Sequence, residues 1–441
     1  MGLSALSPPR FSRPLRGALS LAALIALGGC ASWPRSLGRT PCCIHTKPVV
    51  KRQPIWWHLF DVTVLEPVEQ PLHLLRFGRK LLGVPMRSVN LRERQLSAST
   101  FLMSVDPAPL TPEQVRWGPS RPEDEPQPPL TVTKPKLEGK TPGFFVRDTR
   151  GVRYLLKLDP VESPELLSGS EVVASKLVYA LGYRVPSYEI VSVKADDLRV
   201  DAGAAHGLTP ERLRGLLEPR LRGGSFRAVA SKIVEGEILG PAKFKAFRDC
   251  AEVRALKVAY AWLNNVDSKD HNSLLVWDGT RTMGYLMDFG TSLGADAGLG
   301  GPKTVCEGWL NEVDLKHLSA EVLTLGLHRH ACEPRPVAVS PAVGLFSPSV
   351  NPDRWKPYAP NVAFDAMDAE DARWIARRMA ALSREQIAAA VSAGRYSHPE
   401  DAVYLVNALD QRRRLIVARY LNEEQEEEAE EREEREAKER P

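Results

Sequence analysis

Two short stretches of the chain combine carboxylate, amide and lysine side chains at close intervals, a combination typical of catalytic sites. The stretch "LNNVDSKDHN" contains Asp267, Lys269 and Asn272, and Asp288 of "YLMDFG" follows Asn272 by 16 residues. Carboxylate and amide oxygens are the ligands that Mg²⁺ prefers, and a further carboxylate can take the proton of an attacking hydroxyl group. Transfer of a phosphoryl group needs such a set. We therefore predict that Asp267 and Lys269 are catalytic. Asn272 and Asp288 are the predicted magnesium ligands.

The segment between these two stretches predicts a β-hairpin. "SLLVWD" and "MGYLMDF" are short apolar runs separated by a turn. In a hairpin the second strand ends beside the start of the first strand, so Asp288 would lie close to Asn272. The alternative is a surface turn followed by the end of a buried strand, without chemistry.

The N-terminal half offers a lysine and a glutamate that could hold phosphates. Lys157 lies in the apolar stretch "YLLKLD", which follows a hairpin signal, and Glu171 lies early in the next predicted helix. Lys157 would bind the α- and β-phosphates and Glu171 would orient it, with Glu162 and Glu165 as rival partners. The alternatives are a solvent-facing lysine on an edge strand and a glutamate that is favoured near a helix N-terminus by the helix dipole.

Two further segments could approach a nucleotide. The glycine turn "EGKTPG" contains Gly139 and Gly143, which permit the backbone to come close to phosphates. "KIVEGE" contains Glu235 and lies where a hinge would offer backbone groups to a base. The hinge assignment depends on position alone.

These motifs resemble those of kinases. Asp267, Lys269 and Asn272 reproduce the pattern D-x-K-x-x-N, and Asp288 opens a DFG triplet. The "HR" that precedes the catalytic Asp in protein kinases is absent, and "NV", Asn265 and Val266, replaces it. The loop more closely resembles those of atypical kinases, namely the HipA-like, phosphatidylinositol and secretory-pathway kinases. The resemblance implies ATP and Mg²⁺ as cofactors.

The order of the predicted elements fits an α+β, two-lobed kinase-like fold. Residues 130–240 would form a β-rich N-lobe and residues 241–421 a mostly helical C-lobe. The expected strands are 55–65, 130–134, 144–148, 152–159, 185–193 and 227–238. The expected helices are 168–182, capped by Ser168 or Ser170, then 244–265, 368–382, 383–394 and 399–421.

The N-terminus predicts export and lipid attachment. Arg10, Arg13 and Arg16 precede the apolar run "GALSLAALIALGG", and "LGGC" ends at Cys30. This order resembles a bacterial lipoprotein signal, in which residues 1–29 are removed and Cys30 carries the lipid. The resemblance implies a protein of the bacterial cell envelope, anchored in the outer membrane and facing the periplasm. An ordinary signal peptide or a short anchor is the alternative.

Five cysteines follow Cys30, and none forms a CxxC pair, which disfavours a zinc site. They are Cys42, Cys43, Cys250, Cys306 and Cys332. An exported protein can form disulfides. Because five is odd, at least one thiol would stay free or pair between chains, and the connectivity cannot be deduced from the sequence.

The remaining segments are predicted to lie outside the two lobes. Residues 30–54 form a tether, and residues 55–129 an accessory region that includes a proline-rich linker or wrapping arm. Residues 422–441 form an acidic tail with eleven Glu against four basic residues. The positive charge of the rest of the chain is diffuse, so it does not indicate a nucleic-acid partner.

Three classes of function remain open. The first is a lipid-anchored kinase-like enzyme that binds a nucleotide and phosphorylates a hydroxyl of protein, carbohydrate or lipid. The second is a pseudokinase, because a bacterial envelope holds little ATP. The third is a structural envelope lipoprotein whose motif is accidental. The presence of Asp267, Asn272, Asp288 and Lys157 in one chain favours catalysis.

Overall fold

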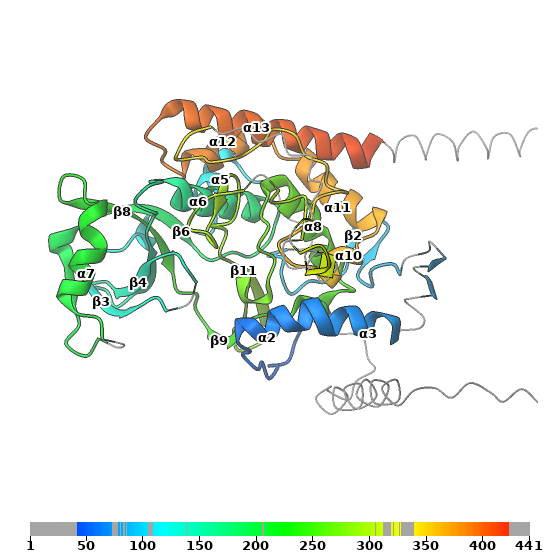
Figure 1. Cartoon of the computed structure of the whole chain (residues 1–441), viewed down its shortest axis with the longest axis horizontal. Coiled ribbons are helices and arrows are strands. Elements are labelled where there is room, and N and C mark those ends of the chain that lie inside the picture. Colours follow the sequence, from blue (N-terminus) through cyan, green and yellow to red (C-terminus); the bar gives the residue numbers. More distant parts are fainter. Residues whose placement is uncertain are drawn as a thin grey trace, which may run out of the picture. The chain divides into compact units, whose positions relative to one another are not determined.

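The computed structural model describes most of the chain after the N-terminal segment (Figure 1). The described residues are 42–422, apart from 73–77, 80, 83, 85, 105–108, 138, 205–206, 305, 312–318, 321, 326 and 328–338. The predicted signal peptide, Cys30 and the acidic tail beyond Asn422 lie outside them. Within the described part, no helix is both long and apolar enough to cross a bilayer.

Helices and strands alternate irregularly along the described chain. The α-helices are α2 (Ile55–Phe60), α3 (Glu66–Leu72), α5 (Pro112–Trp117), α6 (Leu166–Ala180), α7 (Pro210–Leu217), α8 (Ala251–Leu263), α10 (Val362–Asp365), α11 (Ala369–Ala380), α12 (Arg384–Ser392) and α13 (Pro399–Val417). The strands are β1 (Leu91–Arg92), β2 (Gln95–Leu96), β3 (Leu130–Pro135), β4 (Gly143–Arg147), β5 (Arg153–Lys157), β6 (Tyr188–Lys194), β7 (Leu198–Val200), β8 (Ser225–Lys232), β9 (Glu237–Gly240), β10 (Ser273–Trp277), β11 (Thr282–Leu286), β12 (Ala295–Asp296) and β13 (Gly301–Pro302). The described chain also contains short 3₁₀ turns, namely η3 (Pro122–Asp124), η4 (Ala195–Asp197), η5 (Glu218–Arg220), η6 (Phe244–Phe247) and η7 (Asp270–Asn272). Two π-helical turns are η2 (Asp61–Leu65) and η8 (Ala418–Asn422).

The strands between residues 130 and 232 form a six-stranded sheet. Its order is β6-β8-β5-β4-β3-β7, and every pair is antiparallel except β3 with β7. The predicted strands at 130–134, 144–148, 152–159 and 185–193 are confirmed. Strand β8 ends at Lys232, and β9 leaves this sheet to join a second one, so the predicted strand 227–238 is two strands. Helices and a largely antiparallel sheet in separate segments give the α+β class that the sequence predicts.

The two faces of this sheet are covered by different helices. Successive side chains of a strand point to opposite faces. In β8, Ala228 and Ala230 pack in a cluster with Leu213 and Leu217 of α7, whereas Val229 packs with the buried residues of α6. Figure 1 shows α7 and β3 at one end of the described part of the chain, and α6 between the sheet and the helical half.

Helix α6 begins two residues earlier than predicted, and its cap comes from a distant residue. Glu165, which precedes it, has a left-handed backbone with φ +68° and makes no side-chain capping bond. Asp159 Oδ1 instead accepts a hydrogen bond from the Ser168 backbone N–H at 2.8 Å. The prediction that Ser168 or Ser170 caps the helix is therefore wrong, because a carboxylate after β5 satisfies this free N–H. Gly182 follows the helix with φ +96°, as predicted for its C-terminal end.

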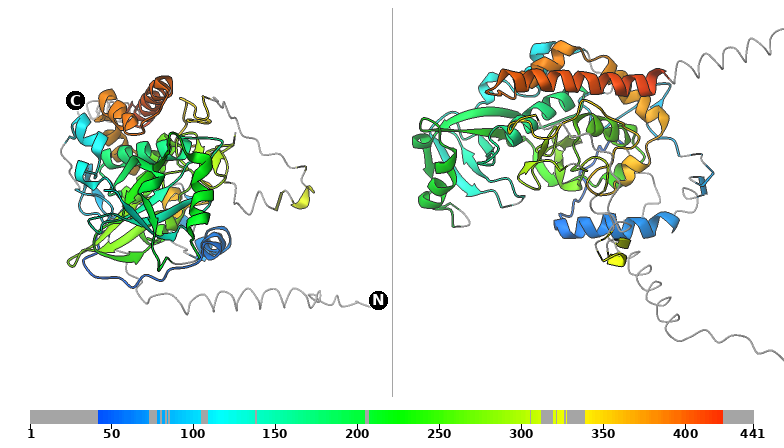
Figure 2. Two further views of the ribbon diagram at one scale, coloured as in Figure 1. Left: turned by 90° about the vertical axis from the view of Figure 1, so that its left-hand side faces the viewer. Right: turned by 45° about the horizontal axis from the view of Figure 1, so that its top comes forward.

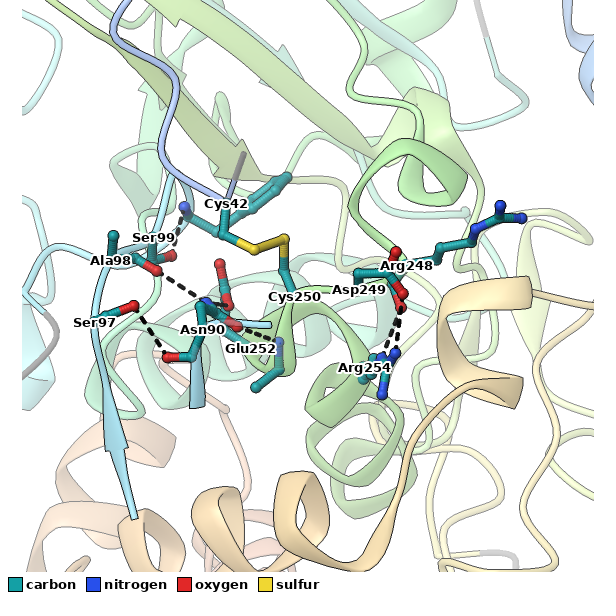
Figure 3. Close-up of a disulfide and its surroundings, with 12 residues drawn as sticks. Cys42, Asn90, Ser97, Ala98, Ser99, Arg248, Asp249, Cys250, Glu252 and Arg254 are labelled. Carbon is teal, nitrogen blue, oxygen red and sulfur yellow. Dashed lines mark hydrogen bonds and ion pairs between the residues drawn. A yellow bond between two sulfur atoms is a disulfide. The ribbon is translucent and has the colours of Figure 1, made fainter. Parts of the chain in front are cut away.

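The predicted long helix 244–265 is interrupted by a disulfide. Cys250 has an extended backbone at the N-cap of α8 and is bonded to Cys42, 208 residues away in sequence (Figure 3). Only α8, residues 251–263, is α-helical, and η6 precedes it. Cys43 carries a free thiol. Cys332 lies outside the described residues.

Residues 55–65 form a helix and not the predicted strand. Helix α2 continues through the π-helical turn η2 into α3. Its buried side is polar: His58 lies 3.4 Å from Asp270, and both carboxylate oxygens of Asp61 accept bonds from Lys245 at 2.6 and 2.8 Å. The apolar alternation on which the strand prediction depended is overridden by these tertiary contacts.

The C-terminal helices pack around α8, and the proline-rich arm wraps onto them. Helices α11 and α13 contact α8, and α12 contacts α5, α6 and α13. Val115 of α5 is fully buried. Figure 2 shows α5, α12 and α13 gathered on one side of the described chain. The predicted helices 368–382, 383–394 and 399–421 are confirmed, and the arm is a wrapping segment.

Candidate active site

A buried ion cluster joins the sheet, helix α6 and the segment after β11. Lys157 Nζ lies 2.5 Å from Glu171 Oε1 and 2.9 Å from Asp288 Oδ1. Lys157 and Glu171 are buried, whereas the Asp288 side chain is 36% exposed. One lysine thus bridges two carboxylates that lie far apart in sequence, and the more exposed carboxylate faces outward.

The charges in this cluster stabilise one another. Burial disfavours the charged form of each group, but the charges of Asp288 and Glu171 outweigh it and raise the pKa of Lys157. Burial likewise opposes ionisation of Asp288, yet the charges of Lys157 and Lys269 hold its pKa well below the usual range. Asp288 is therefore ionised at every physiological pH and remains available to a cation.

The loop after α8 presents Asp267, Lys269 and Asn272 together. Asn264 ends the helix with a left-handed backbone, φ +51°. The Lys269 ammonium donates to Asp267 Oδ2, and Asn272 Nδ2 donates to the Asp267 backbone carbonyl at 2.8 Å. Because the loop uses the amide nitrogen of Asn272, the amide oxygen is the atom left to bind a cation.

The hairpin returns Asp288 to this loop, as the sequence predicts. Strands β10 and β11 pair with Ser273 opposite Leu286, and the Met287 N–H donates to the Asn272 carbonyl at 2.9 Å. Asp288 has φ +62°, a left-handed conformation that costs a non-glycine residue on the order of 1–3 kcal/mol. The surroundings must hold this strained residue in place.

Phe289 and its neighbours supply that restraint. Phe289 is fully buried and packs edge-to-face on Tyr188, with ring centroids 6.4 Å apart. The Asp288 N–H donates to Tyr188 Oη at 3.3 Å, and Ser170 Oγ donates to the Ser292 carbonyl at 2.7 Å. Strand β6 and helix α6 therefore both fix the orientation of Asp288.

The glycine turn lies at the same end of the sheet as Lys157. Strand pairing sets Gly143 opposite Lys157, and a Cβ on Gly143 would lie 2.4 Å from the Leu156 carbonyl oxygen. Gly143 is therefore required by the close approach of β4 to β5. Gly139 has φ +76°, which favours glycine within the turn.

Lys136 is a site residue that the sequence analysis missed. It follows β3 directly, and its Nζ donates to the Thr141 carbonyl across the glycine turn at 3.0 Å. Burial, then the charge of Lys157, lower the pKa of Lys136, while the carboxylates of Asp288 and Glu171 act in the opposite sense. The sequence signal for Lys136 was its position just before the glycine turn, which leads into the strand that pairs with the strand of Lys157. With Lys157 and Lys269, it gives the site three lysines.

Other predicted residues do not join the cluster. Glu165 accepts a bond from the Ser397 N–H at 2.9 Å, and Glu162 is exposed, so Glu171 alone of the three pairs with Lys157. Glu235 lies between β8 and β9 with a side chain that is 90% exposed, 3.6 Å from Lys232. Within the described part of the chain, its side chain forms no ion pair or hydrogen bond with the cluster residues.

The oxygen atoms of Asn272 and Asp288 suit a cation that also binds phosphate and water. Among the described residues, no three His, Cys, Asp or Glu side chains gather as a metal-binding group. Asn272 and Asp288 supply two hard oxygens, and Mg²⁺ is typically bound by one or two protein oxygens together with phosphates and water. The residues present therefore fit Mg²⁺ bound with a phosphate ligand, and do not fit a structural metal site.

A pocket of about 280 Å³ opens beside Asp267 and Lys269, on the side of the loop that faces α2. Its lining includes Asp267 and Lys269 but not Lys157, Glu171 or Asp288.

No protein-family model and no curated protein sequence matches the chain. Among solved structures, it is similar to a proinflammatory kinase of Helicobacter pylori, CtkA, with 12% identity and a TM-score of 0.36, over 66% of this chain and 97% of that one. The function proposed below depends on the geometry of the site.

Proposed function

We propose that the chain is a kinase-like phosphotransferase that moves the γ-phosphoryl group of a nucleotide, ATP or a relative, to a hydroxyl acceptor. The observation that carries this proposal is the buried bridge from Lys157 to Glu171 and Asp288 beside a loop that holds Asp267 and Asn272. In this account the six-stranded sheet with α6 is one lobe and the helical half from residue 241 is the other.

The phosphates would lie between the glycine turn and the loop after α8. Lys157 and Lys136 supply positive charge there, and Glu171 positions Lys157 through their 2.5 Å contact. Asn272 and Asp288 would hold Mg²⁺, which neutralises charge on the phosphates when bound. Lys157, Lys269 and Lys136 all act on the charge of Asp288, and a site that gathers lysines in this way favours a polyanion as its ligand.

We assign to Asp267 the role of acting on the acceptor. An acceptor oxygen would form a bond to the γ-phosphorus while the bond from that phosphorus to the bridging oxygen of the nucleotide breaks. The acceptor proton passes to Asp267, and the nucleoside diphosphate leaves. Lys269, which donates to Asp267 Oδ2, orients the carboxylate and offers its charge to the transferred group.

We also propose that this activity is anchored in the bacterial envelope through lipid on Cys30. The sequence "LGGC" supports it. The disulfide between Cys42 and Cys250 agrees with an oxidising compartment. A lipid on Cys30 would leave 11 residues of tether before Cys42 is fixed to the start of α8.

Nucleotide binding tests the proposal. Non-hydrolysable ATP and GTP analogues are titrated into the full-length protein in mild detergent, with Mg²⁺ or with EDTA. We expect Mg²⁺-dependent binding that Asp288→Ala weakens at least tenfold, because one of two protein oxygens is lost. Asp278→Ala, at the turn of the same hairpin, is the matched control and should bind like wild type. Affinity that responds to neither Mg²⁺ nor Asp288→Ala would contradict the proposed site.

A further inference from the structure

One wall of the pocket beside Asp267 comes from helix α2 and the turn η2. Ile55, Leu59 and Val62 of α2 and η2 form it, and Phe244, Val266 and Pro360 add apolar surface from other elements. The pocket is therefore largely apolar, with the carboxylate of Asp267 at its edge. Its volume of about 280 Å³ suits a small molecule more than a folded partner.

Several polar contacts hold this wall against the loop of Asp267. Asp61 is bound by Lys245, and His58 lies 3.4 Å from Asp270. The Gln53 side chain accepts a bond from Lys243 at 2.8 Å, and the Gln53 carbonyl contacts His271 Nε2 at 2.8 Å. These contacts therefore fix α2 and η2 against the loop that contains Asp267.

Glu66 lies in this pocket with an unfilled hydrogen-bonding position. The residue is 6% exposed, and its Oε2 has no hydrogen-bond partner. The nearest cation, Lys245, lies 3.9 Å from Glu66 Oε1 and is already bound by both oxygens of Asp61. Asp270 adds a third carboxylate. Asp270 Oδ1 accepts from the Phe244 N–H at 2.9 Å, and its Oδ2 lies 3.4 Å from His58 Nδ1, whereas Glu66 Oε2 is left without a donor.

We propose that the pocket binds the phosphate acceptor, and that the acceptor is a small primary amine carrying a hydroxyl group. Its ammonium group donates to Glu66, its carbon skeleton packs against the apolar wall, and its hydroxyl reaches Asp267. This inference rests on the proposed phosphotransferase function for the fate of the hydroxyl. The binding of the amine itself does not depend on that function.

A proton balance distinguishes an ammonium ligand from a neutral one. Burial raises the pKa of Glu66 to about 8, with Asp61, Asp270 and Glu69 adding to the effect and Lys245 opposing it. At pH 7 a carboxyl with this pKa holds about 0.9 proton. An ammonium group beside it favours the ionised form, so binding should release most of that proton. A neutral alcohol releases none.

The test is titration calorimetry of the full-length protein at pH 7 in buffers of different ionisation enthalpy. The probes are the amino alcohols from 2-aminoethanol to 6-amino-1-hexanol and the diols of the same lengths. We expect at least one amino alcohol to bind tenfold or more tightly than its diol, since a charge-assisted hydrogen bond is gained. Its binding should release about 0.9 proton.

Two variants make the outcome decisive. Glu66→Gln keeps the shape and should lose at least tenfold in affinity together with the proton release. Glu69→Gln removes the same charge from the same helix outside the pocket lining, and should bind within twofold of wild type. Equal binding of amines and diols, no binding of any amino alcohol, or proton release that persists in Glu66→Gln would overturn the inference.

Failure of this inference and failure of the proposed function give different results. Loss of amine binding with intact Mg²⁺-nucleotide binding removes the acceptor assignment alone. Amine binding that releases a proton, without any phosphate transfer to the bound amino alcohol, contradicts the acceptor role and leaves an amine site.

Discussion

Replacement of Lys157 by methionine tests the buried ion cluster most sharply. Methionine preserves most of the apolar stem and removes the charge. Glu171 and Asp288 then lose the cation that bridges them, and Glu171 is buried. Removing one partner of a buried ion pair costs about 3–5 kcal/mol. Because the Asp288 side chain is 36% exposed and partly screened by water, we expect about 3 kcal/mol at pH 8.

The pH dependence of that loss identifies its cause. Burial already raises the pKa of Glu171 against the opposing charge of Lys157. Without Lys157 it rises further. A carboxyl whose pKa is higher in the folded protein contributes stability that is present at low pH and lost as the pH rises. The deficit of Lys157→Met should therefore shrink between pH 8 and pH 5, as Glu171 takes up its proton.

Urea denaturation of the full-length protein measures these effects. The double variant Lys157→Met/Glu171→Gln should recover about 1–3 kcal/mol relative to Lys157→Met, because contacting residues are not additive. Lys194→Met, at the exposed end of β6, is the matched control and should change stability by less than about 0.5 kcal/mol. Wild-type stability of Lys157→Met at pH 8, or no recovery in the double variant, would refute the reasoning.

Three further predictions concern other parts of the molecule. Burial raises the pKa of Glu252 to about 7, so Glu252→Gln should stabilise the protein by about 3 kcal/mol at pH 8 and by about 1 kcal/mol at pH 5; an equal effect at both pH values in urea titrations would contradict this. Cys42→Ser should cost about 2–5 kcal/mol by opening the disulfide, whereas Cys43→Ser, which removes the neighbouring free thiol, should be neutral; equal effects would refute the role of the disulfide. Cys30→Ser should abolish metabolic labelling with palmitate, and a wild-type protein without label or acyl mass would rule out the lipid anchor.

The arrangement of the loop after α8 could be predicted because its signal is local. Asp267 and Asn272 lie five residues apart, and the hairpin to Asp288 is encoded by two apolar runs with a turn between them. Lys157 could be found because a lysine inside an apolar strand is unusual. In each case the spacing along the chain determines the spacing in the fold, so few tertiary contacts were needed to bring the residues together.

The features that escaped prediction depend on distant partners. The helix at 55–65 is held by polar contacts to Lys245 and Asp270, which lie about 200 residues further along the chain. The break before α8 lies at Cys250, which is bonded to Cys42, and no local pattern encodes this pairing. Lys136 belongs to the site only because β3 and β4 pair as they do.

A comparison of phosphoryl transfer by wild type and Asp267→Asn tests whether Asp267 takes the proton of the acceptor hydroxyl. Transfer from γ-labelled ATP and GTP to protein, sugar, lipid and amino-alcohol acceptors is measured with Mg²⁺, beside nucleotide affinity for the same preparations. We expect wild-type transfer that falls about 10²–10⁴-fold in Asp267→Asn, with nucleotide affinity changed no more than a few-fold. Equal transfer by the two proteins would contradict the role of Asp267. Nucleotide binding by wild type without transfer to any acceptor would show a nucleotide-binding protein that is not a kinase.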